Sequence, residues 1–116
     1  MNAAREKVDN DPRGCLGCGE RRPSKLDAAH VIDRSLFPGQ GFDEPDGVVP
    51  LCSRIKGGAG CHDAYDAHRL DILPSLTLDE QAAAVAKVGM RAAFVRTTAT
   101  RDVENYTAQE GDAWSL

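Results

Sequence analysis

The four cysteines constrain the fold of this chain more than any other feature of its sequence. They lie at Cys15, Cys18, Cys52 and Cys61 among 116 residues. A Cys-x2-Cys pair presents two thiols from one tight turn, and zinc takes four such ligands in a tetrahedron. The second pair is more widely spaced, but its insert, residues 53–60, is rich in glycine and can loop out without moving either cysteine. We therefore expect the four thiols to bind one structural Zn²⁺.

Two other arrangements of these cysteines are open, namely two disulfides or four free buried thiols. A third is a zinc site of three cysteines and one histidine, in which His62 replaces Cys61. The first residues carry no apolar run of the kind found in signal peptides, and no segment approaches the roughly 20 apolar residues of a membrane span. These features predict a cytoplasmic protein. In that compartment, paired cysteines more often bind metals than form disulfides.

Composition supports a role for zinc in folding and limits the kind of partner. Aromatic residues make up only 5% of the chain, which also has 11 glycines and 6 prolines, so the apolar core looks thin. A filled metal site would add directly to stability. The formal net charge of −4 argues against bulk electrostatic binding of a polyanion. A local basic strip with a bound cation can nevertheless receive a phosphate.

Hydrophobic patterns predict a hairpin followed by helices. Residues 26–32 and 48–51 are short β-prone runs on either side of a Gly/Pro/Asp-rich loop at 37–45, and Pro50 marks a strand end or edge. Residues 61–70 have helical spacing. Thr77 and Glu80 form a capping box for a helix that Gly89 ends or kinks, and residues 90–96 continue as a further helix. The face expected to be buried in the capped helix consists of Leu78, Ala82, Val85 and Val88.

Four segments in this order resemble one known family. They are the Cys15-x2-Cys18 knuckle, the strand His30-Val31-Ile32, the strand Val49-Pro50-Leu51-Cys52, and Cys61-His62 opening a helix. With their spacing, they resemble the HNH endonucleases with a zinc-binding ββα-metal core, over about residues 15–73. The resemblance implies a small α+β fold: a ββα-metal (His-Me finger) core with a zinc-ribbon-like four-cysteine site and C-terminal helices.

The resemblance also implies how the chain is organised. We expect a flexible N-terminus at residues 1–12, which forms at most a frayed helical turn. The HNH nuclease core would follow at residues 13–75, and a C-terminal helical segment at 76–96. Residues 97–116 are expected to be a polar tail.

The family's chemistry assigns roles to particular residues. Phosphodiester hydrolysis needs an activated water, a cation that offsets charge on the phosphate, and a protonated leaving group. The resemblance makes His30 the general base and His62 a ligand of Mg²⁺, Mn²⁺ or another divalent cation, with Asp66 four residues on as a further ligand. It adds Arg34 to the catalytic set. Each has a plainer interpretation: a structural histidine for His30, a zinc ligand or helix N-terminal residue for His62, and solvated charges for Asp66 and the arginines.

Phosphate contacts and surface positions complete these expectations. Arg34 could contact a phosphate, as could the basic side chains of Arg21, Arg22 and Lys56. Solvation is the commoner fate of any one such charge. His68 fits no position of the family motif, and we expect it at the surface.

The sequence departs from the family pattern at two positions. The residue before the general base is usually an Asp or His that binds the metal, and here it is Ala29. Asp27, Asp33, Asp66 or additional waters could take its place. The family's middle Asn, which orients the loop that carries the base, falls at Gly47, where the adjacent Asp46 could assume part of that role.

The function expected from this resemblance is a metal-dependent DNA endonuclease. Small chains of this kind resemble those carried by phages, so the expected partners are DNA and phage packaging or other DNA-processing proteins, in the cytoplasm of the host cell. The alternative is a non-catalytic zinc-ribbon module that binds DNA or a protein. A third function, a redox switch, would use the Cys-x2-Cys thiols.

Overall fold

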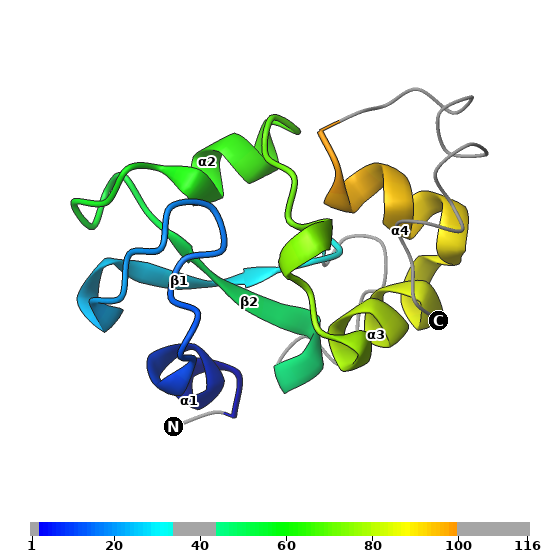
Figure 1. The fold of residues 1–116 in the computed structure, drawn as a ribbon, viewed down its shortest axis with the longest axis horizontal. Helices are drawn as coiled ribbons and strands as arrows, with labels where there is room; N and C mark the ends of the chain where they lie inside the picture. The colour runs from blue at the N-terminus through cyan, green and yellow to red at the C-terminus, as the bar shows by residue number, and fades with distance from the viewer. Residues whose placement is uncertain (1–2, 34–43, 100–116) are drawn as a thin grey trace.

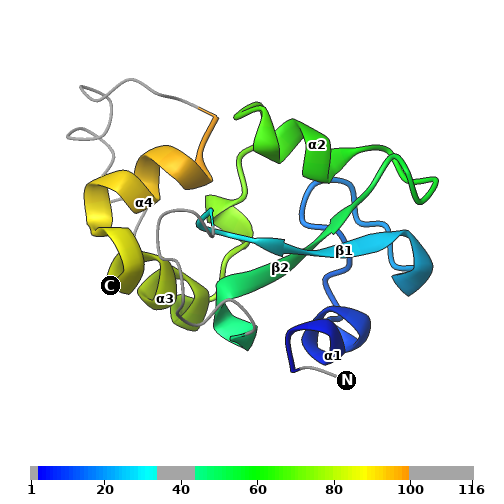
Figure 2. The same ribbon diagram turned by 180° about the vertical axis from the view of Figure 1, so that it is seen from behind.

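The fold is a small α+β arrangement around a two-stranded sheet, here described from a computed structural model for residues 3–33 and 44–99. Figures 1 and 2 show helices α1 and α2 on opposite sides of the sheet, with α3 and α4 beyond one end of it. No helix in these two ranges is long and apolar enough to cross a membrane. The elements in chain order are α1 (Ala3–Asn10), η1 (Pro23–Lys25), β1 (Leu26–His30), η3 (Pro45–Gly47), β2 (Val48–Cys52), α2 (Cys61–Asp66), η4 (Leu73–Ser75), α3 (Leu78–Val88) and α4 (Met90–Thr97).

The sheet pairs β1 with β2 in antiparallel register, with Leu26 opposite Cys52 and His30 opposite Val48. All five residues of β2 are buried, because α1 and α2 both pack against this strand. Pro50 costs no ladder hydrogen bond here, since β2 has an outer edge in a two-stranded sheet. Both expected strands are therefore present. The first ends at His30 instead of continuing to residue 32, although the Val31 amide still donates to the Gly47 carbonyl at 3.0 Å.

The N-terminal segment differs from the sequence expectation, because residues 3–10 form a helix that is docked on the sheet. Ala4 and Val8 are its buried residues. Cationic side chains supply the remaining attachment: Arg5 donates to the Leu26 carbonyl at 2.8 Å, and Lys7 to the Val48 carbonyl at 2.7 Å. An amphipathicity argument misses such a helix, since its attachment depends on side chains that usually face water.

The helices after the sheet follow the expected order with different boundaries. Helix α2 ends at Asp66, four residues short of the expected end. The capping box is present in full, since the Thr77 hydroxyl accepts from the Glu80 amide and the Glu80 carboxylate accepts from the Thr77 amide. Gly89, with φ of 87°, ends α3, and α4 follows at once.

The expected buried face of α3 was wrong in two of its four positions. Leu78 is 56% exposed and Ala82 is also exposed, whereas Glu80, Gln81 and Ala84 are buried. A hydrophobicity pattern places a glutamate on the solvent face. Here the Glu80 carboxylate is compensated by cations from elsewhere in the chain, which allows it to be buried.

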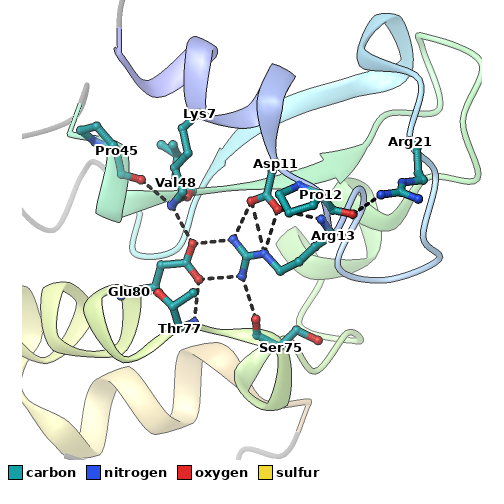
Figure 3. A network of polar contacts seen from close by, with 10 residues as sticks. All are labelled: Lys7, Asp11, Pro12, Arg13, Arg21, Pro45, Val48, Ser75, Thr77 and Glu80. Carbon is teal, nitrogen blue, oxygen red and sulfur yellow. Dashed lines mark hydrogen bonds and ion pairs between the residues drawn. The ribbon is translucent and has the colours of Figure 1, made fainter.

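A buried ion network joins the N-terminal region to α3 (Figure 3). Glu80 is fully buried, and its carboxylate accepts from Lys7 at 2.6 Å and from both terminal nitrogens of Arg13 at 2.7 and 2.9 Å. Arg13 is in turn paired with Asp11 at 2.6 Å. Burial alone would raise the pKa of Glu80, but the hydrogen bonds from Arg13 and Lys7 hold that pKa below its usual value. The network therefore connects α1 and the knuckle segment to a helix more than 60 residues away.

Removal of the Glu80 charge should destabilise the fold. We expect Glu80→Gln to lower the free energy of unfolding by about 3 kcal/mol, because it leaves Lys7 and Arg13 without their counter-charge in largely desolvated surroundings. Denaturant titration of the purified protein measures the change. The control is Asp79→Asn, an exposed carboxylate one residue earlier, which should cost under about 1 kcal/mol. Equal losses in the two variants would contradict the structural role of the network.

The pH dependence of stability follows from the sign of the Glu80 shift. A lowered folded-state pKa stabilises the protein above the usual value of 4.5, and that contribution is lost as the pH falls through the folded value. The wild type should therefore lose stability below about pH 4.5 more steeply than Glu80→Gln.

Candidate metal centre

Four thiols from three parts of the chain meet at one point. Cys15 and Cys18 come from the knuckle before β1, Cys52 ends β2, and Cys61 begins α2. Their sulfur atoms all lie within 4.8 Å of one another, and the Cys18 and Cys52 sulfurs are 3.6 Å apart. A tetrahedral zinc with Zn–S bonds of about 2.3 Å spaces its sulfurs by about 3.8 Å. None of the four forms a disulfide, so the cluster has the ligand type, number and spacing of a zinc site.

The backbone holds the knuckle in this position. The Cys15 amide donates to the Glu20 carbonyl at 2.8 Å, and the Leu16 amide donates to the Pro50 carbonyl on β2 at 3.0 Å. The Cys15 sulfur accepts from the amides of Gly17 and Cys52, each at 3.3 Å. A side chain at Gly17 could not fit, because its Cβ would lie 2.6 Å from the Cys61 sulfur. The close approach of the knuckle to α2 therefore requires glycine at this position.

The thiols differ in acidity, and all four would ionise together only with a cation among them. Burial raises the pKa of Cys61 and of Cys18. Burial acts in the same direction on Cys52, but hydrogen bonds from the Cys61 amide, the Cys18 thiol and the Gly60 amide outweigh it and lower the pKa of Cys52 to about 7. Four crowded thiolates repel one another, so their joint ionisation needs a positive charge among them. A metal ion supplies that charge and deprotonates its thiol ligands.

His62 directly follows Cys61 in the sequence, but its side chain contacts Asp27 and not the thiol cluster. Its Nδ1 lies 2.8 Å from the Asp27 carboxylate on β1, and its Nε2 lies 3.6 Å from the Asp66 carboxylate one turn along α2. Asp27 also pairs with Lys56 at 2.8 Å. Burial would raise the pKa of Asp27, but the hydrogen bonds from His62 and Lys56 lower it. The converging set thus contains Cys61 and not His62, and a set of three cysteines with His62 is not the arrangement observed.

His30 lies at the end of β1, half-buried and opposite Val48. Alternation along a strand places Asp27 and Ala29 on one face and His30 on the other. The face of Asp27 is turned toward α2, since Asp27 contacts His62. Ala29 is fully buried on that face and contributes no ligand atom. His30 therefore projects from the opposite side of the strand, next to the strand end.

Two of the three carboxylates considered as replacements for a ligand at Ala29 approach His62, namely Asp27 and Asp66. Asp33 instead pairs with Arg96 at 3.4 Å. These groups do not form a preassembled cage: within residues 3–33 and 44–99, the cysteines are the only set of three or more His, Cys, Asp or Glu side chains with converging ligand atoms. Sequence reasoning had not paired Asp27 with His62. The sequence signal for this contact is the alternation of side chains along β1. Asp27 and Ala29 are two residues apart, so Asp27 lies on the same face of the strand as the residue expected to bind the metal.

The other expected site residues are placed as follows. The Gly47 carbonyl accepts the Val31 amide, so the backbone at the position of the family's Asn fixes the residue directly after His30. Arg34 lies outside the described residues.

Arg21 and Arg22 are exposed, and Arg22 pairs with Glu20 at 2.8 Å. His68 is half-buried, not at the surface as expected.

Comparison of the chain with models of known families, with curated proteins and with solved structures finds no match. The proposed function therefore depends on the residues and geometry of this chain and on the resemblance of its motifs that the sequence suggested.

The metal content of the protein tests the cysteine cluster. We expect one tightly bound zinc per chain after native purification, and its removal by a chelator should lower the melting temperature sharply, because the metal joins three segments around a thin core. Cys18→Ser should reduce zinc content, whereas Ser53→Ala, beside Cys52, should not. A protein that purifies without zinc, and whose melting temperature is insensitive to chelators, would rule out this site.

Proposed function

We propose that this chain is a zinc-stabilised, metal-dependent endonuclease of the HNH type that hydrolyses DNA phosphodiester bonds. The observation that carries the proposal is the order of elements around the sheet. A strand ends in His30, an antiparallel partner follows, and a helix then opens with Cys61-His62. Because Cys52 and Cys61 belong to one thiol cluster, the start of α2 is held beside the sheet, with His62 against β1.

Each histidine has a separate role in this proposal, and because the two lie toward different faces of β1, the phosphate would meet both at the end of the strand, where His30 is the last residue. His30 accepts a proton from the attacking water, which a neutral imidazole can do near neutral pH. His62 and Asp66, on consecutive turns of α2, would hold a divalent cation such as Mg²⁺ or Mn²⁺. A bound cation would offset negative charge on the phosphate. Asp27 receives the Nδ1 side of His62, which fixes the ring and leaves Nε2 toward Asp66.

The remaining roles concern substrate and partners. Arg34 is proposed to contact the phosphate, where a guanidinium can form two hydrogen bonds to its oxygens. DNA is the proposed substrate, and phage packaging or other DNA-processing proteins are the proposed partners.

Replacement of the proposed base should separate catalysis from folding. We expect His30→Ala to keep the fold, the zinc and DNA affinity, while plasmid nicking in Mg²⁺ or Mn²⁺ falls by about 10²- to 10⁴-fold. The matched control is His68→Asn, which should keep wild-type activity. Asparagine suits this position because His68 has φ of 62°. A folded, zinc-loaded His30→Ala protein that nicks DNA at the wild-type rate would refute the role of His30.

The proposed cation ligand makes a different prediction. His62→Ala should abolish metal-dependent nicking and leave the zinc content unchanged, because the four thiols converge without His62. Activity is measured as a function of Mn²⁺ concentration, beside zinc analysis of the same sample. If the variant loses zinc and unfolds, His62 belongs to the structural site and this assignment is incorrect.

A second candidate function is a non-catalytic zinc-ribbon module that binds DNA or a protein. It is favoured by the buried Ala29, which offers no ligand atom at the family's metal-binding position, and by the engagement of Asp27 with both His62 and Lys56. A zinc-loaded protein that binds duplex DNA but does not nick it in either Mg²⁺ or Mn²⁺ would select this function.

A further inference from the structure

The loop between β2 and α2, residues 53–60, extends beyond one end of the sheet (Figure 1), and its sequence contains Ile55. Ile55 is 97% exposed, far more than Leu78, the other large apolar side chain exposed in the described residues. Arg54 and Lys56 flank it. A single exposed apolar residue needs no explanation by itself. Ile55 differs from other exposed apolar residues because its loop is held by backbone hydrogen bonds and has basic neighbours.

The loop has a fixed shape in spite of its glycines. The Gly57 amide donates to the Arg54 carbonyl at 3.0 Å, and the Gly58 amide to the Ser53 carbonyl at 2.8 Å, which folds the tip into consecutive turns. The loop is closed by Cys52 and Cys61, both in the thiol cluster. The tip is thus presented in one conformation, so its ordering costs little on binding.

The loop lies beside the short basic segment before β1. The Ser53 amide donates to the Lys25 carbonyl at 3.0 Å, which brings the two segments together. Residues 20–27 and 53–60 contain five basic and two acidic side chains, in a chain whose net charge is −4. In the described part of the chain, Arg54, Arg21 and Lys25 form no ion pair with a carboxylate. The Asp63 carboxylate lies near the Arg54 guanidinium at Gly60, so this end of the molecule carries an excess of positive charge that is partly offset by Asp63.

We infer that this tip is a DNA-docking element, in which Ile55 inserts into the minor groove of a duplex while Arg54 and Lys25 contact the flanking phosphates. The inference rests on the proposed function and names how the substrate is held. Apolar wedges between base steps, with basic neighbours on the backbone, are a known means of minor-groove binding. A protein partner fits less well, because one isolated side chain is far smaller than the roughly 800 Å² per partner of a specific interface.

The position of the tip relative to the proposed cation ligand supports this assignment. Lys56, next to Ile55, donates to the Leu26 carbonyl at 3.2 Å and pairs with Asp27, which also holds His62. Lys56 thus holds the loop against β1, and we do not assign it a direct contact with a phosphate. A duplex held at Ile55 would be connected through Lys56 and Asp27 to the ring of His62.

Binding without cleavage tests the inference separately from catalysis. The full-length, zinc-loaded protein is titrated without added Mg²⁺ or Mn²⁺ against a fluorescent A·T-rich duplex, with 2-aminopurine reporting base unstacking. Ile55→Ser should weaken binding on the order of tenfold and abolish the unstacking signal, whereas Ile55→Leu should retain both. Arg54→Ser should reduce the slope of log affinity against log salt by about one. The controls are Leu78→Ser on α3 and Arg91→Ser on α4, which should change neither.

The outcomes distinguish this inference from the nuclease assignment. If Ile55→Ser binds and unstacks the duplex like the wild type, the docking role is overturned, whatever the nicking assay gives. If the wild type binds no duplex, the inference also fails. Binding of the tip to anionic lipid vesicles but not to duplexes would overturn it in favour of a membrane surface. Ile55-dependent binding by a protein that never nicks DNA supports the docking role and removes the nuclease assignment.

Discussion

The convergence of four sulfur atoms is the constraint on which the proposed site depends. The cluster joins the knuckle, the end of β2 and the start of α2, so one centre links three segments that are distant in the sequence. His62 is placed against β1 because Cys61 precedes it, and the loop that carries Ile55 begins and ends at thiols. In a domain of this size, a metal bound by the four thiols would add to the order that the apolar core supplies.

A second buried electrostatic centre complements the first. The Glu80 carboxylate lies near the start of β2, at the opposite end of that strand from Cys52, and joins α1, the segment before the knuckle and α3 through Lys7 and Arg13. Buried ion pairs of this type add little net stability compared with apolar packing, but the loss of one partner is costly. In this protein the pair between Lys7 and Glu80 ties α1 to α3.

Helices, strands and caps could be predicted well from the sequence, whereas the contacts that pack these elements against one another could not. The capping box at Thr77, the stop at Gly89 and the strands around Pro50 depend on neighbouring residues, and all are present in the structure. The thiol set was predictable because few residue types bind zinc. Three features could not be predicted from the sequence: the docked α1, the burial of Glu80 and the Asp27–His62 contact. Each depends on a partner 35 or more residues away or on charged groups that usually face water. The proposed catalytic roles still depend on the family resemblance.

The closure of the loop at Cys52 and Cys61 has a consequence for how such a domain can change over time. Its ends are held by the thiol cluster and its backbone bonds are internal or to one neighbouring segment, so Lys56, which contacts Leu26 and Asp27, is the side chain that ties the tip to the sheet. Chain-closure entropy rises only slowly with loop length, by about 0.6 kcal/mol for each doubling. Tip residues other than Lys56 and Gly58, such as Ile55, can therefore be exchanged with little penalty to folding. This region is the natural place for related sequences to diverge in what they contact, while the framework behind it stays the same.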